Sequence, residues 1–366
     1  MDTKKQGLKI TWWQKTDKFI LLPTIFLFLF GIIAISSISQ HVANKIYLPS
    51  DMILKKHLIF CLFGLFIIFL TSNLSIKNLV IISFIIFFGA VILSFIAIFF
   101  FPETKGANRW IKVLNFSFQP SELLKPSFVI VSAVFLGRYK IKHDNSIFIN
   151  IVCLLIVSLL LILQPDFGMF LLIFGAWLVQ ILTSNIKKNI IIPILGSFVV
   201  VFTICFFSLE HVRFRIMNFI YSDIGDNYQI TKSLKSFESG GLFGKGIGEA
   251  SISRNLPDVQ SDFIFALIGE ELGGIFALLI ISMYLILYTR AHIVSQKSNN
   301  LFVIISITGI ANLLIFQVII NLSSTLNIIP TKGMTLPFIS YGGSSLISSS
   351  LMIGFLLLLI RNKHNE

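Results

Sequence analysis

Charged residues are scarce in this 366-residue chain. Asp, Glu, Lys and Arg make up 13% of it, hydrophobic residues make up 55%, and the mean hydropathy is +0.88. An ordinary soluble domain carries roughly a quarter charged residues, and its core could not hide this much apolar surface. The shortage of charge therefore excludes a soluble globular protein and predicts an integral membrane protein, in which lipid covers the apolar side chains.

Cysteine is also scarce. Cys61, Cys153 and Cys205 all lie inside apolar runs, without the spacing of a disulfide framework or a metal site. The net charge of +12 is divided among short clusters between apolar runs, which is the usual pattern at the flanks of membrane spans. We therefore expect no nucleic-acid partner and no structural metal.

Long apolar runs, by contrast, are abundant. A spanning helix needs about 20 apolar residues, so the sequence predicts an all-α polytopic membrane protein of about ten transmembrane helices. These helices form one predicted membrane domain, residues 19–360, between an N-terminal tail at 1–18 and a C-terminal tail at 361–366. The first run is too long for a signal peptide, and no cleavage site follows it. The predicted spans are 19–37, 54–72, 79–101, 120–139, 147–164, 168–184, 189–208, 262–289, 302–321 and 344–360.

The positions of Lys and Arg predict the orientation. A lysine cluster before the first span places the N-terminal tail in the cytoplasm, and an even number of spans returns the C-terminal tail to the same side. The loops at 102–119 and 209–261 then face outside. The second lies between the seventh and eighth helices, and loops of such length are usually functional or disordered. Its glycine, aromatic and apolar content makes disorder the weaker explanation.

Two predicted outer segments flank the middle spans. Arg109 lies in the first, which continues to Glu122 and Lys125 at a helix start, three apart on one face. A helix cap with one ion pair explains Glu122 and Lys125 without a function, whereas the cost of charge at a membrane entrance favours one. The second segment is the turn 164–168, where a turn-stabilising role is the better explanation for Asp166 taken alone.

The third segment belongs to the long loop. Its glycine run, 240–248, has no Ser or Thr after Lys245 and no preceding strand, so it is not a nucleotide-binding loop. Glycines still let a backbone approach an anion, and Lys245 is suited to a phosphate. Asp262 stands at the mouth of the eighth span, with Glu270 about 12 Å deeper near the same face. Acids along a span are functional by default. The alternative is a helix-capping Asp262 with Glu270 and Glu271 buried and paired.

The fourth segment, 330–345, has two prolines, three glycines and several hydroxyl groups between apolar runs. It predicts a re-entrant stretch, which survives at membrane depth only when it is buried in protein or lines a cavity. All four segments lie on the predicted outer side, and together they form a polar site between apolar helices. Such a site suits a lipid-linked, anionic, sugar-like substrate. The charged residues that converge there are Arg109, Glu122, Lys125, Asp166, Lys245, Asp262 and Lys332.

These segments resemble the SEDS family of bacterial proteins (shape, elongation, division and sporulation). The stretch 326–345 looks closer to the division members than to the elongation members, and Ser261 keeps a hydroxyl where the family usually has Thr. The similarity covers nearly the whole membrane region in the expected order. It rests on 106–111, 119–122 with Lys125, 164–168, 240–248, 262–266 with 270–273, and 337–345.

The resemblance implies a peptidoglycan glycosyltransferase that polymerises lipid II, the undecaprenyl-pyrophosphate-linked disaccharide peptide. It implies a place in the bacterial cytoplasmic membrane at the division septum, beside a class B penicillin-binding protein and other divisome membrane proteins. It also implies that Asp262 is the catalytic residue, acting as a general base. A carboxylate at the membrane boundary is suited to take the proton of the acceptor hydroxyl in an inverting displacement.

The other site residues are expected to bind the substrate. Arg109, Lys125 and Lys245 are candidates to stabilise the pyrophosphate leaving group. A divalent cation, Mg²⁺ or Mn²⁺, is compatible with that task, but no residue cluster requires one. The remaining candidates for substrate binding are Glu122, Asp166, Lys332 and Ser340.

Two other functions stay open. A lipid II transporter (flippase) would show charges near the membrane midplane with paired repeats or broken helices. The charges here lie mainly on one side, although amides inside spans keep a transporter open and helix–helix hydrogen bonding also explains them. A non-catalytic scaffold that activates the penicillin-binding protein is the other alternative. The amides in question are Gln180, Asn312, Gln317 and Asn321.

Overall fold

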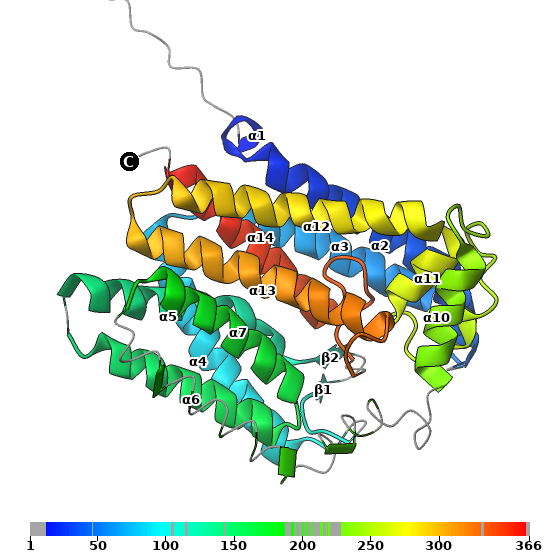
Figure 1. The fold of residues 1–366 in the computed structure, drawn as a ribbon, viewed down its shortest axis with the longest axis horizontal. Helices are drawn as coiled ribbons and strands as arrows, with labels where there is room; N and C mark the ends of the chain where they lie inside the picture. The colour runs from blue at the N-terminus through cyan, green and yellow to red at the C-terminus, as the bar shows by residue number, and fades with distance from the viewer. Residues whose placement is uncertain are drawn as a thin grey trace, which may run out of the picture.

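The structure, a computed structural model, is a bundle of long helices with a short hairpin at one end (Figure 1). The predicted span at 189–208, the first part of the long loop and Lys332 fall largely or wholly outside the described residues. Those residues are 12–45, 47–103, 106–113, 116–142, 144–186, 228–330 and 333–363, with isolated positions between 192 and 219.

The described helices confirm an all-α polytopic protein. Eight of them are long and apolar enough to cross a membrane, and α7 is a shorter apolar helix. The hairpin of β1 and β2 is antiparallel and lies in a stretch for which the sequence predicts only a loop. In chain order the elements are α1 (Trp12–Lys15), α2 (Lys18–Lys45), α3 (Met52–Ser72), α4 (Ile76–Phe100), β1 (Ile111–Val113), β2 (Phe116–Phe118), α5 (Pro120–Lys142), α6 (Ser146–Leu163), α7 (Phe167–Thr183), α10 (Tyr228–Gly240), η1 (Ser253–Asn255), α11 (Ile264–Glu271), α12 (Gly273–Gln296), α13 (Leu301–Thr325) and α14 (Gly343–Lys363).

Three helices form the buried centre of the bundle. Most of α5, α13 and α14 is buried, whereas α3, α4 and α12 expose large apolar side chains such as Phe66, Ile85 and Leu278. Exposed apolar faces of this length require lipid around them. Charged and amide side chains are buried in this centre too, among them Lys125, Gln317 and Asn321.

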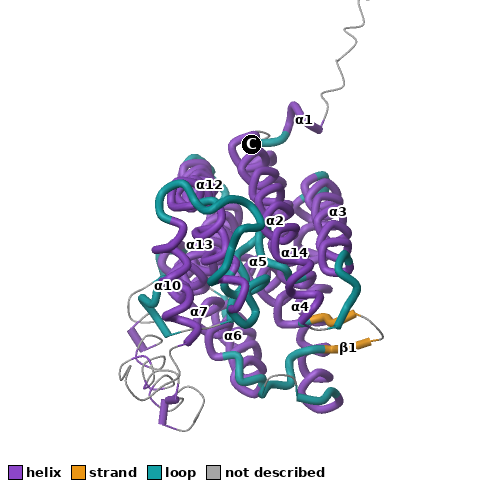
Figure 2. Tube along the Cα trace, turned by 90° about the vertical axis from the view of Figure 1, so that its right-hand side faces the viewer, coloured by secondary structure: helices purple, strands orange, loops and turns teal. Residues whose placement is uncertain are grey.

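Both described ends of the chain meet at one end of the bundle. The indole of Trp12 donates to the hydroxyl of Ser72 (2.9 Å), and the guanidinium of Arg361 donates to the carbonyl of Leu74 (2.7 Å). The turn between α3 and α4 therefore contacts both. The hairpin, α10 and α11 lie at the opposite end (Figure 1), which Figure 2 views end-on, with α10 on one side and β1 on the other.

The eighth predicted span, 262–289, is wrong as a single helix. Its first part is α11, which ends at Glu271, and α12 begins at Gly273 with a φ of +84°. A Cβ at Gly273 would lie 2.4 Å from the backbone nitrogen of Gly244, so this position requires glycine. The chain breaks here because the long loop packs against the junction.

The loop 241–246 satisfies the backbone groups that this break leaves without helical partners. The carbonyls that end α11 accept from the N–H groups of Lys245 and Gly246, both at 3.0 Å. The first N–H groups of α12 donate to the carbonyls of Gly241 and Leu242, at 2.9 and 3.2 Å. The loop therefore acts as a cap for two helices at once.

Candidate functional site

Asp262 stands in a tight turn just before α11. The N–H groups of Ser261 and Asp262 both donate to the carbonyl of Asp258, at 3.0 and 2.9 Å, and Asp258 has a φ of +53°. The side chain of Asp262 is half-buried, so solvent reaches it. The turn thus presents a carboxylate at the end of the bundle, as the sequence predicts.

A buried amide holds this turn in place. Asn321, near the C-terminal end of α13, is completely buried, and its Nδ2 donates to the carbonyl of Asp262 (3.0 Å) and to that of Met334 (2.6 Å). One side chain therefore connects the Asp262 turn to the segment 333–341. Because a buried donor needs a partner, the two carbonyls and the amide fix one another.

The segment 333–341 forms a second connection to the turn. The hydroxyl of Ser340 donates to the carbonyl of Ser261 (2.5 Å) and accepts from the N–H of Leu336 (2.8 Å). The N–H of Tyr341 donates to the carbonyl of Gln260 (2.8 Å). The segment is non-helical and largely buried, which agrees with the predicted stretch of irregular backbone enclosed by protein. Ser340 serves the backbone here.

Gly333 lies directly against the Asp262 carboxylate. A Cβ at Gly333 would be 2.5 Å from Oδ2 of Asp262, closer than any van der Waals contact allows. Gly333 is exposed, so the surface beside the carboxylate is formed by main chain without a side chain. Gly333 lies inside the fourth segment, but nothing in its sequence context indicates this contact.

Arg109 and Asp166 lie together at the same end. Nη1 of Arg109 is 3.3 Å from Oδ2 of Asp166, which also accepts from Nε2 of Gln119 (3.3 Å). The other carboxylate oxygen accepts from the N–H of Met169 (3.3 Å) and caps α7. Asp166 therefore has the turn-stabilising role that its sequence context favours, and in addition it pairs with Arg109.

Glu122 and Lys125 pair as their spacing predicts, but the pair is buried. The amino group of Lys125 is 2.5 Å from Oε2 of Glu122 and donates to Oε1 of Gln317 (2.9 Å). Nε2 of Gln317 donates in turn to the carbonyl of Thr335 (2.9 Å). Lys125 has no exposed surface, so it meets the rest of the site through Gln317 and Thr335.

Lys245 pairs with Glu270 at the start of the long loop's contact with α11. Its amino group is 3.0 Å from Oε1 of Glu270 and 3.1 Å from the hydroxyl of Ser251. The same carboxylate accepts from the N–H groups of Ile252 (3.0 Å) and Ser253 (2.7 Å). Glu270 thus fastens the long loop to α11, and the alternative of a buried, paired acid describes it correctly.

Two glycines of the run 240–248 pack against protein backbone. A Cβ at Gly240 would lie 2.0 Å from the carbonyl oxygen of Gly269, and one at Gly244 would lie 2.2 Å from that of Glu271. Glycine is required at both positions for close approach to α11. These two contacts, and not an anion loop, explain glycine at these two positions.

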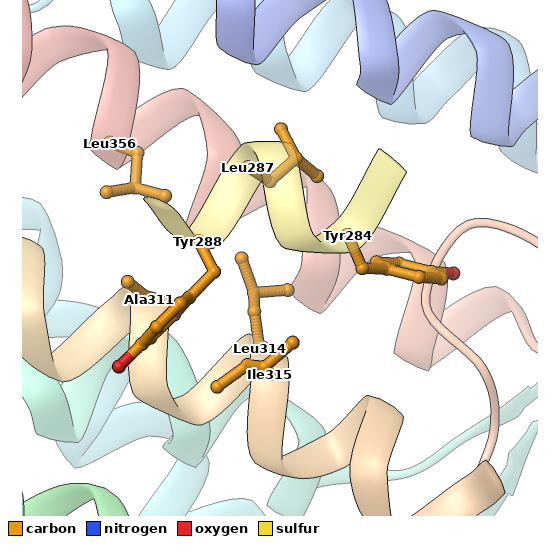
Figure 3. A pocket seen from close by; sticks show the side chains of 7 residues that line it. All are labelled: Tyr284, Leu287, Tyr288, Ala311, Leu314, Ile315 and Leu356. Atoms are coloured by element: carbon orange, nitrogen blue, oxygen red, sulfur yellow. The ribbon is translucent and has the colours of Figure 1, made fainter. Parts of the chain in front are cut away.

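One small apolar crevice lies between α12, α13 and α14 (Figure 3). Tyr284 points out of it, and its hydroxyl donates to the carbonyl of Pro337 (2.5 Å). The crevice has no charged group suited to a sugar phosphate. Within the described residues, no three His, Cys, Asp or Glu side chains are grouped to hold a metal ion. The lining residues of the crevice are Tyr284, Leu287, Tyr288, Ala311, Leu314, Ile315 and Leu356.

The sequence matches the model of the FtsW/RodA/SpoVE family, described as cell cycle protein, over residues 18–365. A probable peptidoglycan glycosyltransferase FtsW of Caulobacter vibrioides is 33% identical over 361 residues, which cover 96% of this chain and 91% of that protein. The protein of the same name from Riesia pediculicola is 34% identical over 358 residues, covering 93% of this chain and 94% of its own.

Two solved structures share the fold. One, described as structural coordination of polymerization and crosslinking by a peptidoglycan synthase complex, has a TM-score of 0.78 and 23% identity, covering 96% of this chain and 99% of its own. The rod shape determining protein RodA of Thermus thermophilus has a TM-score of 0.72 and 23% identity, covering 97% and 99%. At this identity the likeness concerns the fold.

Proposed function

The chain belongs to the FtsW/RodA/SpoVE family of cell cycle proteins, and on that premise we propose that it is a peptidoglycan glycosyltransferase which polymerises lipid II during cell division. It is a multi-pass protein of the inner membrane. The observation that carries the proposal is the half-buried Asp262 carboxylate, fixed through its main chain at the end of the bundle where the polar segments meet.

In the proposed reaction Asp262 is the general base. Its carboxylate takes the proton of the acceptor sugar hydroxyl as that oxygen attacks the anomeric carbon of the donor. The bond from the anomeric carbon to the lipid pyrophosphate breaks, and the pyrophosphate leaves with the bonding electron pair. A single displacement inverts the anomeric centre and requires no covalent enzyme intermediate.

Rigid support of Asp262 favours this role. A general base acts only within hydrogen-bond reach of the proton it takes, and small displacements reduce the rate strongly. The bonds from Asn321 to the carbonyl of Asp262 and from Ser340 to the carbonyl of Ser261 fix the main chain on both sides of the Asp262 peptide. The half-buried carboxylate remains accessible to substrate.

Arg109 is our first candidate for the pyrophosphate. Its side chain is 22% exposed, and among the described residues its 3.3 Å contact with Asp166 leaves guanidinium donors for a two-pronged contact with phosphate oxygens. Lys125 is enclosed, so we assign it to the shape and electrostatic potential of the site. Lys245 neutralises Glu270. Lys332 directly precedes Gly333, and it is our second candidate for binding the pyrophosphate.

A transporter is the less favoured alternative. The amides that kept it open have structural partners: Gln180 donates to the carbonyls of Val129 (2.8 Å) and Ile305 (3.3 Å), and Asn312 donates within its own helix. Gln317 and Asn321 bind the segment 333–341 near the end of the bundle. These contacts bind helices and loops together and outline no path through the membrane.

We propose a class B penicillin-binding protein as the partner, because one structure of similar fold belongs to a complex for polymerization and crosslinking. Other divisome membrane proteins complete the proposed assembly at the septum. Both tails are assigned to the cytoplasm from the lysines before the first span, and the two described chain ends share one end of the bundle.

The decisive experiment is polymerisation of purified lipid II by the purified chain with its penicillin-binding partner. Wild type should form glycan strands, and Asp262→Asn should form none because an amide cannot accept the proton. Glu249→Gln is the matched control, since Glu249 is an exposed acid on the same loop, and it should stay active. Near-normal polymerisation by Asp262→Asn would exclude the base role. If substitutions in the penicillin-binding partner abolish polymerisation while Asp262→Asn does not, the non-catalytic scaffold is favoured.

A further inference from the structure

Three large apolar side chains project from the tip of the glycine run. Leu242 is 66% exposed, Phe243 is 82% exposed and Ile247 is 58% exposed. Large exposed apolar groups this close together mark a surface that contacts something apolar. The glycine contacts with α11 and α12 explain the backbone of this loop but do not explain these side chains.

The loop is fixed in height relative to the membrane spans. The carbonyl of Leu242 accepts from the N–H of Ile275, and that of Gly241 accepts from Gly274, so the tip is level with the first turn of α12. α12 is one of the helices long and apolar enough to cross a membrane. Ile275 and Leu278 in its first turns are exposed, and lipid is the medium that covers such a face.

The exposed apolar surface of α12 extends onto its neighbours on both sides. On one side it adjoins α2, where Phe30 packs edge-on against Phe276 with ring centres 6.3 Å apart. On the other side it continues onto Leu242, which begins the loop tip. Because Leu242 and Ile275 are neighbours at one level, the medium that covers Ile275 also reaches Leu242.

Part of the loop-tip backbone is satisfied by protein. The N–H groups of Gly244, Lys245 and Gly246 donate to carbonyls of Gly240, Glu270 and Glu271, at 2.8, 3.0 and 3.0 Å. Non-helical backbone enters lipid only when its polar groups are satisfied by protein. These three groups therefore need no partner from the surrounding medium.

We propose that the loop 242–247 is immersed in the lipid leaflet at the Asp262 end of the bundle, with Leu242, Phe243 and Ile247 as its anchors. Aromatic and aliphatic side chains at this level are typical of interfacial anchors. Through the bonds from Lys245 and Gly246 to α11, the anchor would set the height of α11, and with it Asp262, relative to the lipid surface.

Site-specific fluorescence quenching tests the proposal without requiring catalysis. A bimane label is placed at Phe243→Cys in a chain whose own cysteines are replaced by alanine, reconstituted in vesicles of phosphatidylethanolamine and phosphatidylglycerol. Lipids with a nitroxide near the headgroup should quench the label at 243 several-fold more than aqueous iodide does. Glu249→Cys, an exposed polar position on the same loop, is the matched control and should show the opposite preference.

Ile247→Cys provides a second, independent label, so that poor insertion of one variant does not decide the outcome. Equal iodide quenching at 243, 247 and 249 would overturn the proposal. The measurement is then repeated with the penicillin-binding partner in the same vesicles. Loss of lipid quenching at 243 and 247 without a gain in iodide quenching would also overturn it, because the surface would then be a protein contact. Either result leaves the proposed glycosyltransferase activity untouched.

Discussion

Gly333→Ala should displace the Asp262 carboxylate without removing it. A Cβ there would lie 2.5 Å from Oδ2, whereas ordinary contact begins at 3.4 Å, so the carboxylate must withdraw by about 1 Å. Oδ2 is the far end of a flexible side chain, so the displacement costs little stability. A misplacement of about 1 Å in a catalytic group lowers the rate by on the order of 100-fold.

The assay is steady-state polymerisation of lipid II by the purified complex. We expect Gly333→Ala to lower kcat by about 100-fold, in line with such a misplacement, with little change in thermal stability. Gly342→Ala is the matched control on the same segment, since its Cβ would meet nothing closer than 3.4 Å, and it should keep its activity. Activity of Gly333→Ala within twofold of wild type would refute the placement of Asp262 at the reaction centre.

Three further substitutions test the surrounding contacts. Asn321→Ala leaves two buried carbonyls without their donor, and it should lower the free energy of unfolding by about 1–3 kcal/mol and reduce polymerisation. Lys245→Met should lower thermal stability, because Glu270 loses its counter-ion, while the KM for lipid II changes little. The protein with Glu122→Lys and Lys125→Glu exchanged should insert normally but polymerise poorly. In wild type, Oε1 of Gln317 accepts a hydrogen bond from Lys125, and after the exchange it would face a carboxylate.

Each of these has a contrary outcome. Unchanged melting of Asn321→Ala would mean that water replaces the amide, and Asn312→Ala, whose bond lies within its own helix, is the control. A large rise in the KM of Lys245→Met for lipid II would mean that Lys245 binds the pyrophosphate. Full activity of the protein with Glu122 and Lys125 exchanged would mean that this pair only caps a helix.

The spans and the position of Asp262 could be predicted from sequence because both depend on local pattern. Apolar length alone identifies a span, and an acid at the start of an apolar run can be recognised without a structure. The break at Gly273 could not be predicted in the same way, because glycine is common inside spans. What breaks the helix is the loop at 241–246, about 30 residues away along the chain.

The roles of the buried polar residues were also beyond the sequence. The sequence suits Lys245 to a phosphate, and only the fold shows that it pairs with Glu270, separated by 25 residues. The sequence identifies Asn321 as an amide inside a span, but its partner Asp262 is 59 residues away. Pattern identifies such residues as unusual, whereas their partners depend on tertiary contacts.

The contacts around Asp262 separate its position from its chemistry. Asn321 binds the main-chain carbonyl of Asp262, and Ser340 binds that of Ser261, so these supports do not use the carboxylate oxygens. Asp262→Asn should therefore keep the supported turn and its stability while losing the proton acceptor. Asn321→Ala keeps the acceptor and loosens the support. If positioning and proton transfer are distinct contributions, the first variant is stable and inactive, and the second is less stable and retains partial activity.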